Sequence, residues 1–137
     1  MPLTSKVIYQ GNLRNQAEHL KSGQVILNDA PLDNNGKGEA FSPTDMVATA
    51  LATCALTLMG IRAKQEGFDL EETSASVVKE MASDPRRIST IAISISIKAN
   101  CSEKMQKILE GVGRNCPVSK SLSSDLKQEF EFNWTGA

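Results

Sequence analysis

A long apolar segment in the first half of the chain constrains the fold more than any other feature. The run from Met46 to Ile61 covers 16 residues, carries no charge and includes three threonines. Crossing a bilayer as a helix takes roughly 20 predominantly apolar residues, so this run is short for a membrane span. We therefore expect it to form the buried core helix of a protein that does not enter the membrane.

The start of this helix is marked by capping residues. Ser42 suits the N-cap, Pro43 suits the first helical position, and Asp45 completes an S-x-x-D box. Apolar residues then recur at alternating spacings of four and three, which predicts one stripe of a helix that runs to about Gln65 and ends at Gly67. The stripe that we expect to face the core consists of Val47, Leu51, Cys54, Leu58 and Ile61.

Short strands are expected on both sides of this helix. Residues 6–9 and 24–27 favour a small antiparallel sheet of hairpins, and residues 33–38 favour an exposed loop. Residues 73–81 and 88–98 flank a turn at Pro85 and predict a second hairpin. The second strand of that hairpin alternates isoleucines with small residues, so its isoleucine face should meet the core helix. These isoleucines are Ile91, Ile93, Ile95 and Ile97.

The last third of the chain predicts a second helix, a short helical piece and a final strand. Ser102 can cap the second helix, whose apolar stripe extends to Cys116. The short piece should start at Pro117, and Phe130, Phe132 and Trp134 alternate with polar residues as a strand would. The pattern as a whole predicts an α+β fold.

Composition and charge exclude several classes of function. A chain of 137 residues fits a single domain, here residues 1–137. Lysine and arginine total 15 against 16 acidic residues, and aromatic residues make up only 4%, so neither nucleic acid nor a membrane surface is an expected partner. Three cysteines cannot all pair within one chain, and the N-terminus lacks a signal-like pattern. We expect a cytoplasmic protein.

Two cysteines are candidates for redox chemistry. A reactive thiolate needs a cation, a helix N-terminus or a base nearby. Cys54 lies about three turns into its helix, too deep for the helix dipole, so its activation requires a cation from elsewhere; the alternative is a small buried hydrophobe. Cys116 directly precedes Pro117, where the amides of a new helical turn would favour a negative sulfur, or it is a buried residue that ends a helix. Cys101 we interpret as structural.

The remaining motifs give no sign of a metal or a nucleotide cofactor. His19 is the only histidine and has no cysteine or histidine at ligand spacing, so we interpret it as a surface residue. The glycines form neither a dinucleotide-binding nor a P-loop pattern. We therefore expect no cofactor.

Three motifs taken together resemble the OsmC/Ohr family, which comprises osmotically inducible protein C and the organic hydroperoxide resistance proteins. They are the segment Glu39-Ala40-Phe41-Ser42-Pro43-Thr44-Asp45, the Ala/Thr-rich helix with Cys54, and Asn115-Cys116-Pro117-Val118-Ser119. The organic-hydroperoxide branch has glutamate where this chain has Thr44, so the resemblance is to the OsmC-like branch. It implies an intertwined homodimer in which long core helices pack on antiparallel sheets built from both subunits.

The resemblance also implies an activity, the thiol-dependent reduction of organic hydroperoxides to alcohols. Cys54 would be the peroxidatic cysteine, which becomes a sulfenic acid, and Cys116 the resolving cysteine, which forms a disulfide that an external dithiol reduces. Arg14 would activate Cys54 of the partner chain and be held by an acidic residue, either Glu39 or Asp45; Glu39 is favoured, since Asp45 suits the helix cap. A substrate pocket would include Phe41, Met46, Leu51 and Leu58.

Two other functions are compatible with the same residues. One is a non-catalytic module that binds a small apolar or acyl ligand, favoured by the apolar stripe around Cys54. The other is a thiol redox sensor, in which the two cysteines respond to oxidation without turnover.

Overall fold

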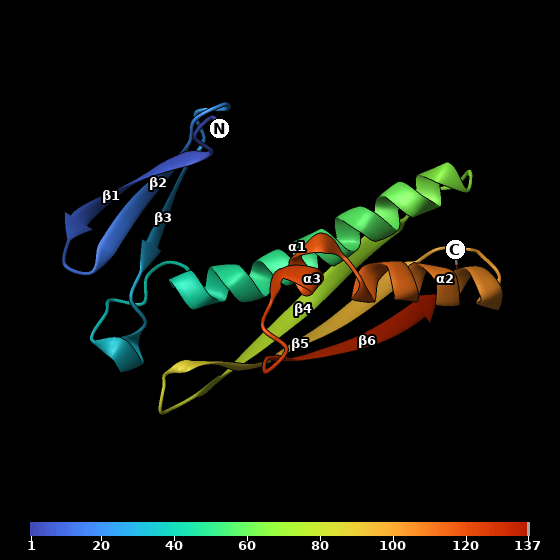
Figure 1. Ribbon diagram of the computed structural model, residues 1–137. Coiled ribbons are helices and arrows are strands. Elements are labelled where there is room, and N and C mark those ends of the chain that lie inside the picture. The colour runs from blue at the N-terminus through green and yellow to red at the C-terminus, as the bar shows by residue number, and fades with distance from the viewer. Residues whose placement is uncertain (137) are drawn as a thin grey trace. The chain divides into compact units, whose positions relative to one another are not determined.

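The computed structural model describes residues 1–136, and the chain divides into two compact units at Val47 and Ala48. Figure 1 traces the order of the elements along the chain. The first unit contains the N-terminal strands and the start of the long helix α1 (Pro43–Gln65). The second contains the rest of α1 and all later elements. Each unit is described by itself below.

The first unit is built on a three-stranded antiparallel sheet in the order β1-β2-β3. Its strands are β1 (Ser5–Gly11), β2 (Arg14–His19) and β3 (Val25–Asp29). The sequence predicted β1 and β3 but not β2, because most residues of β2 are polar. Hydrogen bonding to a neighbour on each side holds β2 in the strand conformation despite that composition.

The segment between this sheet and α1 is a loop, as predicted, with a short 3₁₀ helix η1 (Leu32–Asn34) at its start. Helix α1 then begins at the expected residue. The Asp45 amide donates to Ser42 Oγ at 3.0 Å, and the Ser42 amide donates to Asp45 Oδ2 at 3.0 Å. This reciprocal capping box confirms the predicted start.

The end of α1 is confirmed as well. Gly67 has a φ of +91°, which favours glycine, and its amide donates to the Lys64 carbonyl at 3.1 Å. The Phe68 amide donates to the Ala63 carbonyl at 3.0 Å, which completes a Schellman motif.

The second unit packs helices on one face of a three-stranded sheet in the order β4-β5-β6 (Figure 1). The strands β4 (Glu71–Ala82) and β5 (Arg87–Lys98) form the predicted antiparallel hairpin. After the helices α2 (Glu103–Arg114) and α3 (Pro117–Ser121), strand β6 (Lys127–Thr135) pairs with β5 in the parallel direction. The prediction of antiparallel sheets is therefore correct for the hairpins, but β6 is parallel to its neighbour β5.

The core of the second unit lies between this sheet and the helices. All four isoleucines of the predicted face of β5 are at most 2% exposed and join residues of α1 and α2 in one apolar cluster, which confirms that prediction. Ser102 Oγ accepts a hydrogen bond from the Met105 amide at 3.2 Å and caps α2 as expected.

The buried face of α1 differs from the predicted stripe. Val47 and Ile61 are 38% and 48% exposed in the single chain. Leu51 is buried as predicted, and Cys54 and Leu58 are partly buried against the core. The other buried residues of α1 are Ala48, Ala52, Ala55, Met59 and Ala63. Because α1 is apolar around most of its circumference, periodicity does not define which side meets the sheet. The small alanines occupy the contact face, where the backbone of the helix can approach the isoleucines closely.

Helix α1 is also longer than the apolar run that predicted it. It has 23 residues, and its apolar window of 18 residues has a mean hydropathy of 1.6, so by length and composition alone it could cross a membrane. The core helix of a soluble protein satisfies the same criterion, and 33% of the apolar window of α1 is buried within the chain.

Candidate active site

The two candidate thiols meet in the core of the second unit. Cys116 is completely buried, and Cys54 is partly buried and packs against the same apolar cluster. The Cys54 side chain is near enough to influence the pKa of the Cys116 thiol, and both thiols are free. Residues 62 positions apart in the sequence are thereby brought together by α1 and by the connection between α2 and α3.

Burial determines the protonation state of Cys116. Removal from water raises the pKa of the Cys116 thiol, and the hydrogen bond and negative charge of Cys54 raise that pKa further. The amides of Ser119 and Val118 lower it, although neither completes a capping hydrogen bond to the sulfur. The amides therefore act in the direction that the sequence predicted, but burial is the larger effect and keeps the pKa of the Cys116 thiol above its ordinary value. Cys116 remains a neutral thiol near pH 7.

Cys101 lies at the edge of the same core. It is partly buried, and burial raises the pKa of its thiol. No cation or amide contributes to that shift. This environment agrees with the interpretation of Cys101 as a structural residue.

A second cluster of candidate side chains lies in the first unit, where Arg14 is held by two carboxylates. The hairpin turn at Asn12 and Leu13, both with positive φ, places Arg14 at the start of β2, directly opposite Asp29 at the end of β3. Arg14 Nε and Nη2 donate to the two carboxylate oxygens of Asp29 at 2.6 and 2.8 Å. Nη2 also donates to Glu39 Oε1 at 3.3 Å.

Asp29 is the principal partner of Arg14. Its side chain is 0% exposed, whereas the side chain of Glu39 is 66% exposed. The amide of Glu39 donates to Asp29 Oδ2 at 3.2 Å, so Glu39 supports the carboxylate with its backbone as well as contacting Arg14 with its side chain. The sequence predicted a contact between Arg14 and Glu39 and missed Asp29. The signal that could have identified Asp29 is its position as an acidic residue at the end of β3, the strand that pairs with the strand of Arg14.

The paired charges stabilise each other's ionised forms. The hydrogen bond from Arg14 lowers the pKa of Asp29 against the opposing effect of burial, and the same bond raises the pKa of Arg14. A lowered carboxyl pKa contributes stability that is present above its unfolded value near 3.8 and is lost as the pH falls through the folded value. The Arg14–Asp29 pair is therefore fully charged at neutral pH.

The loop before α1 keeps Glu39 beside Asp29. The Asp29 amide donates to the Phe41 carbonyl at 3.2 Å, and the Gly38 amide donates to the Ala30 carbonyl at 3.2 Å. A Cβ atom on Gly36 would lie 1.8 Å from the Ala30 carbonyl oxygen. Only glycine fits at position 36 with this loop conformation, which explains one of the glycines of the loop.

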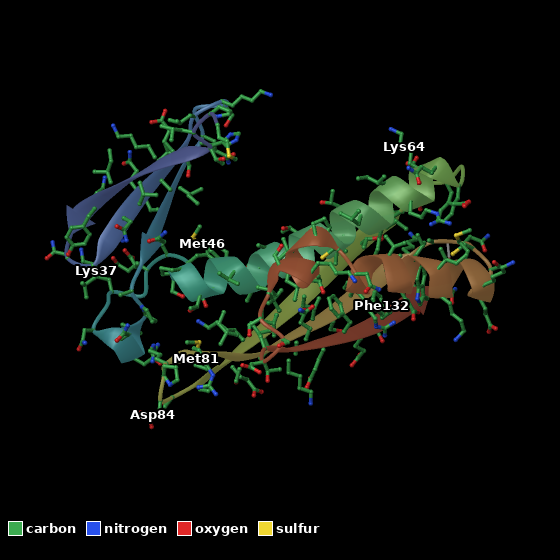
Figure 2. All side chains as sticks on the ribbon, viewed as in Figure 1. Lys37, Met46, Lys64, Met81, Asp84 and Phe132 are labelled. Atoms are coloured by element: carbon green, nitrogen blue, oxygen red, sulfur yellow. The ribbon has the colours of Figure 1, made fainter. Side chains whose placement is uncertain are left out.

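The four residues predicted to line a substrate pocket occupy different environments. In the first unit Phe41 is 56% exposed, and Met46, labelled in Figure 2, lies near the start of α1 with its sulfur 3.4 Å from Asn28 Nδ2. In the second unit Leu51 is completely buried, and Leu58 packs at the edge of the core. Leu51 therefore packs the core in the single chain.

The described residues hold no group of three or more metal-binding side chains. His19 is exposed, and its Nδ1 forms a hydrogen bond with Ser22 Oγ at 2.6 Å, which fits the surface role expected for it.

Comparison with known proteins identifies the family. Residues 36–131 match the family described as OsmC-like protein, and the chain belongs to that family. No curated protein matches the sequence. The matched segment contains Glu39, both cysteines and the Ser42-Pro43-Thr44-Asp45 motif, and it begins after Arg14 and Asp29.

Solved structures share the fold over nearly the whole chain. One is a Psychrobacter arcticus protein described as belonging to the osmotic stress and detoxification response, with 48% identity, a TM-score of 0.93 and coverage of 96% of both chains. An organic hydroperoxide resistance protein OsmC from Legionella pneumophila has 14% identity and a TM-score of 0.69, covering 97% of this chain and 98% of its own. One from Elizabethkingia anophelis has 12% identity and a TM-score of 0.75, covering 98% and 99%. These two show a common α+β fold.

Proposed function

We propose that this protein is a thiol-dependent hydroperoxide reductase in which Cys54 is peroxidatic and Cys116 is resolving. The observation that carries the proposal is that both thiols border the same apolar core and that Cys54 influences the pKa of Cys116, with Cys54 partly exposed and Cys116 buried. A peroxide must reach the first thiol, whereas the second has only to reach the first. The names of the structural neighbours from Legionella and Elizabethkingia, which are organic hydroperoxide resistance proteins, support the same chemistry.

The proposed cycle has three steps. The Cys54 thiolate attacks the distal oxygen of ROOH, the O–O bond breaks, and the alkoxide takes up a proton to leave as ROH. The Cys116 sulfur then attacks the sulfur of the Cys54 sulfenic acid; the S–O bond breaks, and the departing hydroxide takes the thiol proton as water. An external dithiol reduces the disulfide by thiol exchange and is itself oxidised to a disulfide.

Arg14 is the cation that we propose for Cys54 activation. Within the part of the chain that the structure describes, its hydrogen bonds to Asp29 and Glu39 use Nε and Nη2. Nη1 is therefore available for a further acceptor. A guanidinium held by a buried carboxylate has a fixed direction and a permanent charge. Such a group stabilises a thiolate without having to reorganise during the reaction.

We propose that a second copy of the chain supplies this arginine. The sheet of the first unit exposes consecutive apolar residues of β1 and β3, on both of its faces, and α1 exposes Val47 and Ile61. A three-stranded sheet with apolar groups on both faces requires additional cover. An intertwined cytoplasmic homodimer would bury these groups. The alignment over 96% of the chain with the Psychrobacter arcticus structure supports the treatment of residues 1–137 as one domain.

The substrate that we propose is an organic hydroperoxide. An apolar pocket that includes Phe41, Met46 and Leu58 would favour an alkyl or aryl group over hydrogen peroxide, and Leu51 would support it from the core.

The roles of the two carboxylates can be separated by substitution. In Asp29→Asn protein, Arg14 loses its buried charge partner and its fixed direction, so kcat/KM for cumene hydroperoxide should fall by about 10- to 100-fold. The rate of Cys54 alkylation by iodoacetamide at a fixed pH should fall as well. Glu39→Gln, which alters an exposed contact, should change the rate by less than about threefold. An equal loss in both variants would contradict the dominance of Asp29.

The proposal is tested most directly with Cys116→Ser. The parent should consume cumene hydroperoxide continuously with dithiothreitol and form an intramolecular disulfide without it. The Cys116→Ser protein should complete one reduction per site and then accumulate a sulfenic acid that dimedone traps, which intact mass spectrometry detects. A parent protein that consumes no peroxide and retains a bound ligand in native mass spectrometry would instead favour the non-catalytic binding module.

A further inference from the structure

A pair of hydrogen bonds joins the connection that carries Cys116 to strand β6. Ser119 Oγ donates to Gln128 Oε1 at 2.5 Å, and Gln128 Nε2 donates to the Ser119 carbonyl at 3.1 Å. We call these two residues the Ser119–Gln128 clamp. Both lie within the second unit, and both contacts are partly buried.

The chemistry of the two groups defines how the clamp is oriented. A backbone carbonyl only accepts hydrogen bonds, so the side of Gln128 that faces the Ser119 carbonyl must be the NH₂ group. The amide oxygen then faces the Ser119 hydroxyl. That hydroxyl also lies 2.8 Å from the Arg114 carbonyl, so its one proton is shared between the end of α2 and β6. Ser119 thereby connects α2, α3 and β6.

Helix α3 needs an external attachment. It has five residues, and its first turn is closed by the bond from the Lys120 amide to the Cys116 carbonyl at 3.0 Å. One turn of helix is unstable alone, because nucleation fixes several dihedral angles for a single hydrogen bond. Cys116 is the N-cap of α3, three residues before Ser119. The position of its sulfur therefore depends on what holds this turn.

We propose that Gln128 is a positioning residue for Cys116, because the Ser119–Gln128 clamp holds α3 where the Cys116 sulfur faces Cys54. The inference rests on the proposed function and extends it to the resolution step. In that step the Cys116 sulfur forms a bond with the Cys54 sulfur, the S–O bond of the sulfenic acid breaks, and hydroxide leaves with the thiol proton as water. Loss of the clamp should slow this ring closure and leave the attack on peroxide unchanged.

The test uses an oxidant that needs no peroxidase activity. Diamide, a diazene, accepts two electrons and two protons from a pair of thiols: one thiolate adds to it, and the second thiol displaces the hydrazine to form the disulfide. Closure of the Cys54–Cys116 disulfide would be followed in quenched samples of the full protein by alkylation and peptide mass spectrometry. Gln128→Ala should slow closure of the adduct by about tenfold or more, because misplacement of one reacting group by about 1 Å costs that much or more.

Two further variants make the test specific. Ser119→Ala removes the hydroxyl and keeps the carbonyl that Gln128 binds. Its rate of disulfide formation should therefore be intermediate between those of Gln128→Ala and the parent. Asn133→Ala removes outward-facing hydrogen bonds from the same strand, at 3.3 Å to Ser94 Oγ and 3.2 Å to Glu131, and should close at the parent rate. With cumene hydroperoxide, Gln128→Ala should show a parent-like first step and increased dimedone trapping.

The outcomes separate this inference from the proposed function. The proposed role of Gln128 would be overturned if Gln128→Ala formed the disulfide in diamide at a rate within twofold of the parent. Equal slowing in Asn133→Ala would also overturn it, as would a parent protein in which the two thiols form no disulfide. A parent that closes in diamide but does not reduce cumene hydroperoxide would overturn the peroxidase proposal, and slowed closure in Gln128→Ala would then still support the clamp.

Discussion

Cys54→Ser protein is expected to reduce cumene hydroperoxide at least about 10³-fold more slowly than the parent, because a serine hydroxyl replaces the only partly exposed member of the thiol pair. Cys116 cannot substitute for it: the sulfur is completely buried, and burial holds its pKa above the ordinary value. Steady-state peroxide consumption with dithiothreitol measures the effect.

The matched control is Cys101→Ser. Cys101 is also partly buried at the edge of the same core, and no contact with Cys54 or Cys116 contributes to its pKa. This variant should retain the parent rate within about twofold. Cys54→Ser protein that consumes peroxide as fast as the parent would contradict the mechanism, and a parent that is oxidised once without turnover would favour the sensor.

Arg14→Met protein should lose about 100-fold in kcat/KM, because a preorganised positive charge at an anionic reacting centre contributes on that scale. Methionine retains much of the side-chain volume and removes the guanidinium. Loss of the cation also leaves the buried Asp29 carboxylate without its partner. The folded fraction of the variant should therefore be checked by urea unfolding at the assay pH and at a fixed protein concentration.

A mixing experiment tests whether this arginine acts across the subunit boundary. Arg14→Met and Cys54→Ser proteins should each be nearly inactive alone. After unfolding and refolding together in equal amounts, half of the dimers would be mixed, and each mixed dimer would contain one intact site if Arg14 serves the other chain. Activity should then return to about one quarter of the parent value, as statistical pairing in a twofold dimer requires. No recovery in mixed dimers isolated by two affinity tags would contradict action in trans.

Local signals were sufficient to predict much of the fold. The capping pair Ser42 and Asp45 identified the first residue of α1, and Gly67 identified its end, because both effects depend on neighbours in the sequence. Alternation of isoleucine with small residues identified the buried face of β5, because a strand has a strict period of two.

Properties that depend on distant partners were not predictable in this way. The polar strand β2 exists because two neighbours pair with it, and Asp29 acquires its importance only when β3 places it opposite Arg14. The protonation state of Cys116 depends on burial by distant elements, which outweighs the adjacent amides. Val47 and Ile61 were wrongly placed on the contact face of α1 because both sides of that helix are apolar.

The parallel direction of β6 has a consequence for the order in which the thiol pair is completed. Two neighbouring parallel strands need a long crossover between them, and here that crossover, residues 99–126, contains Cys116. During synthesis Cys54 and Cys116 both emerge before β6 does. A chain in which β6 has not yet formed holds the two sulfurs without the strand that contacts Ser119, so we expect the thiol pair to be positioned only after β6 has docked against β5.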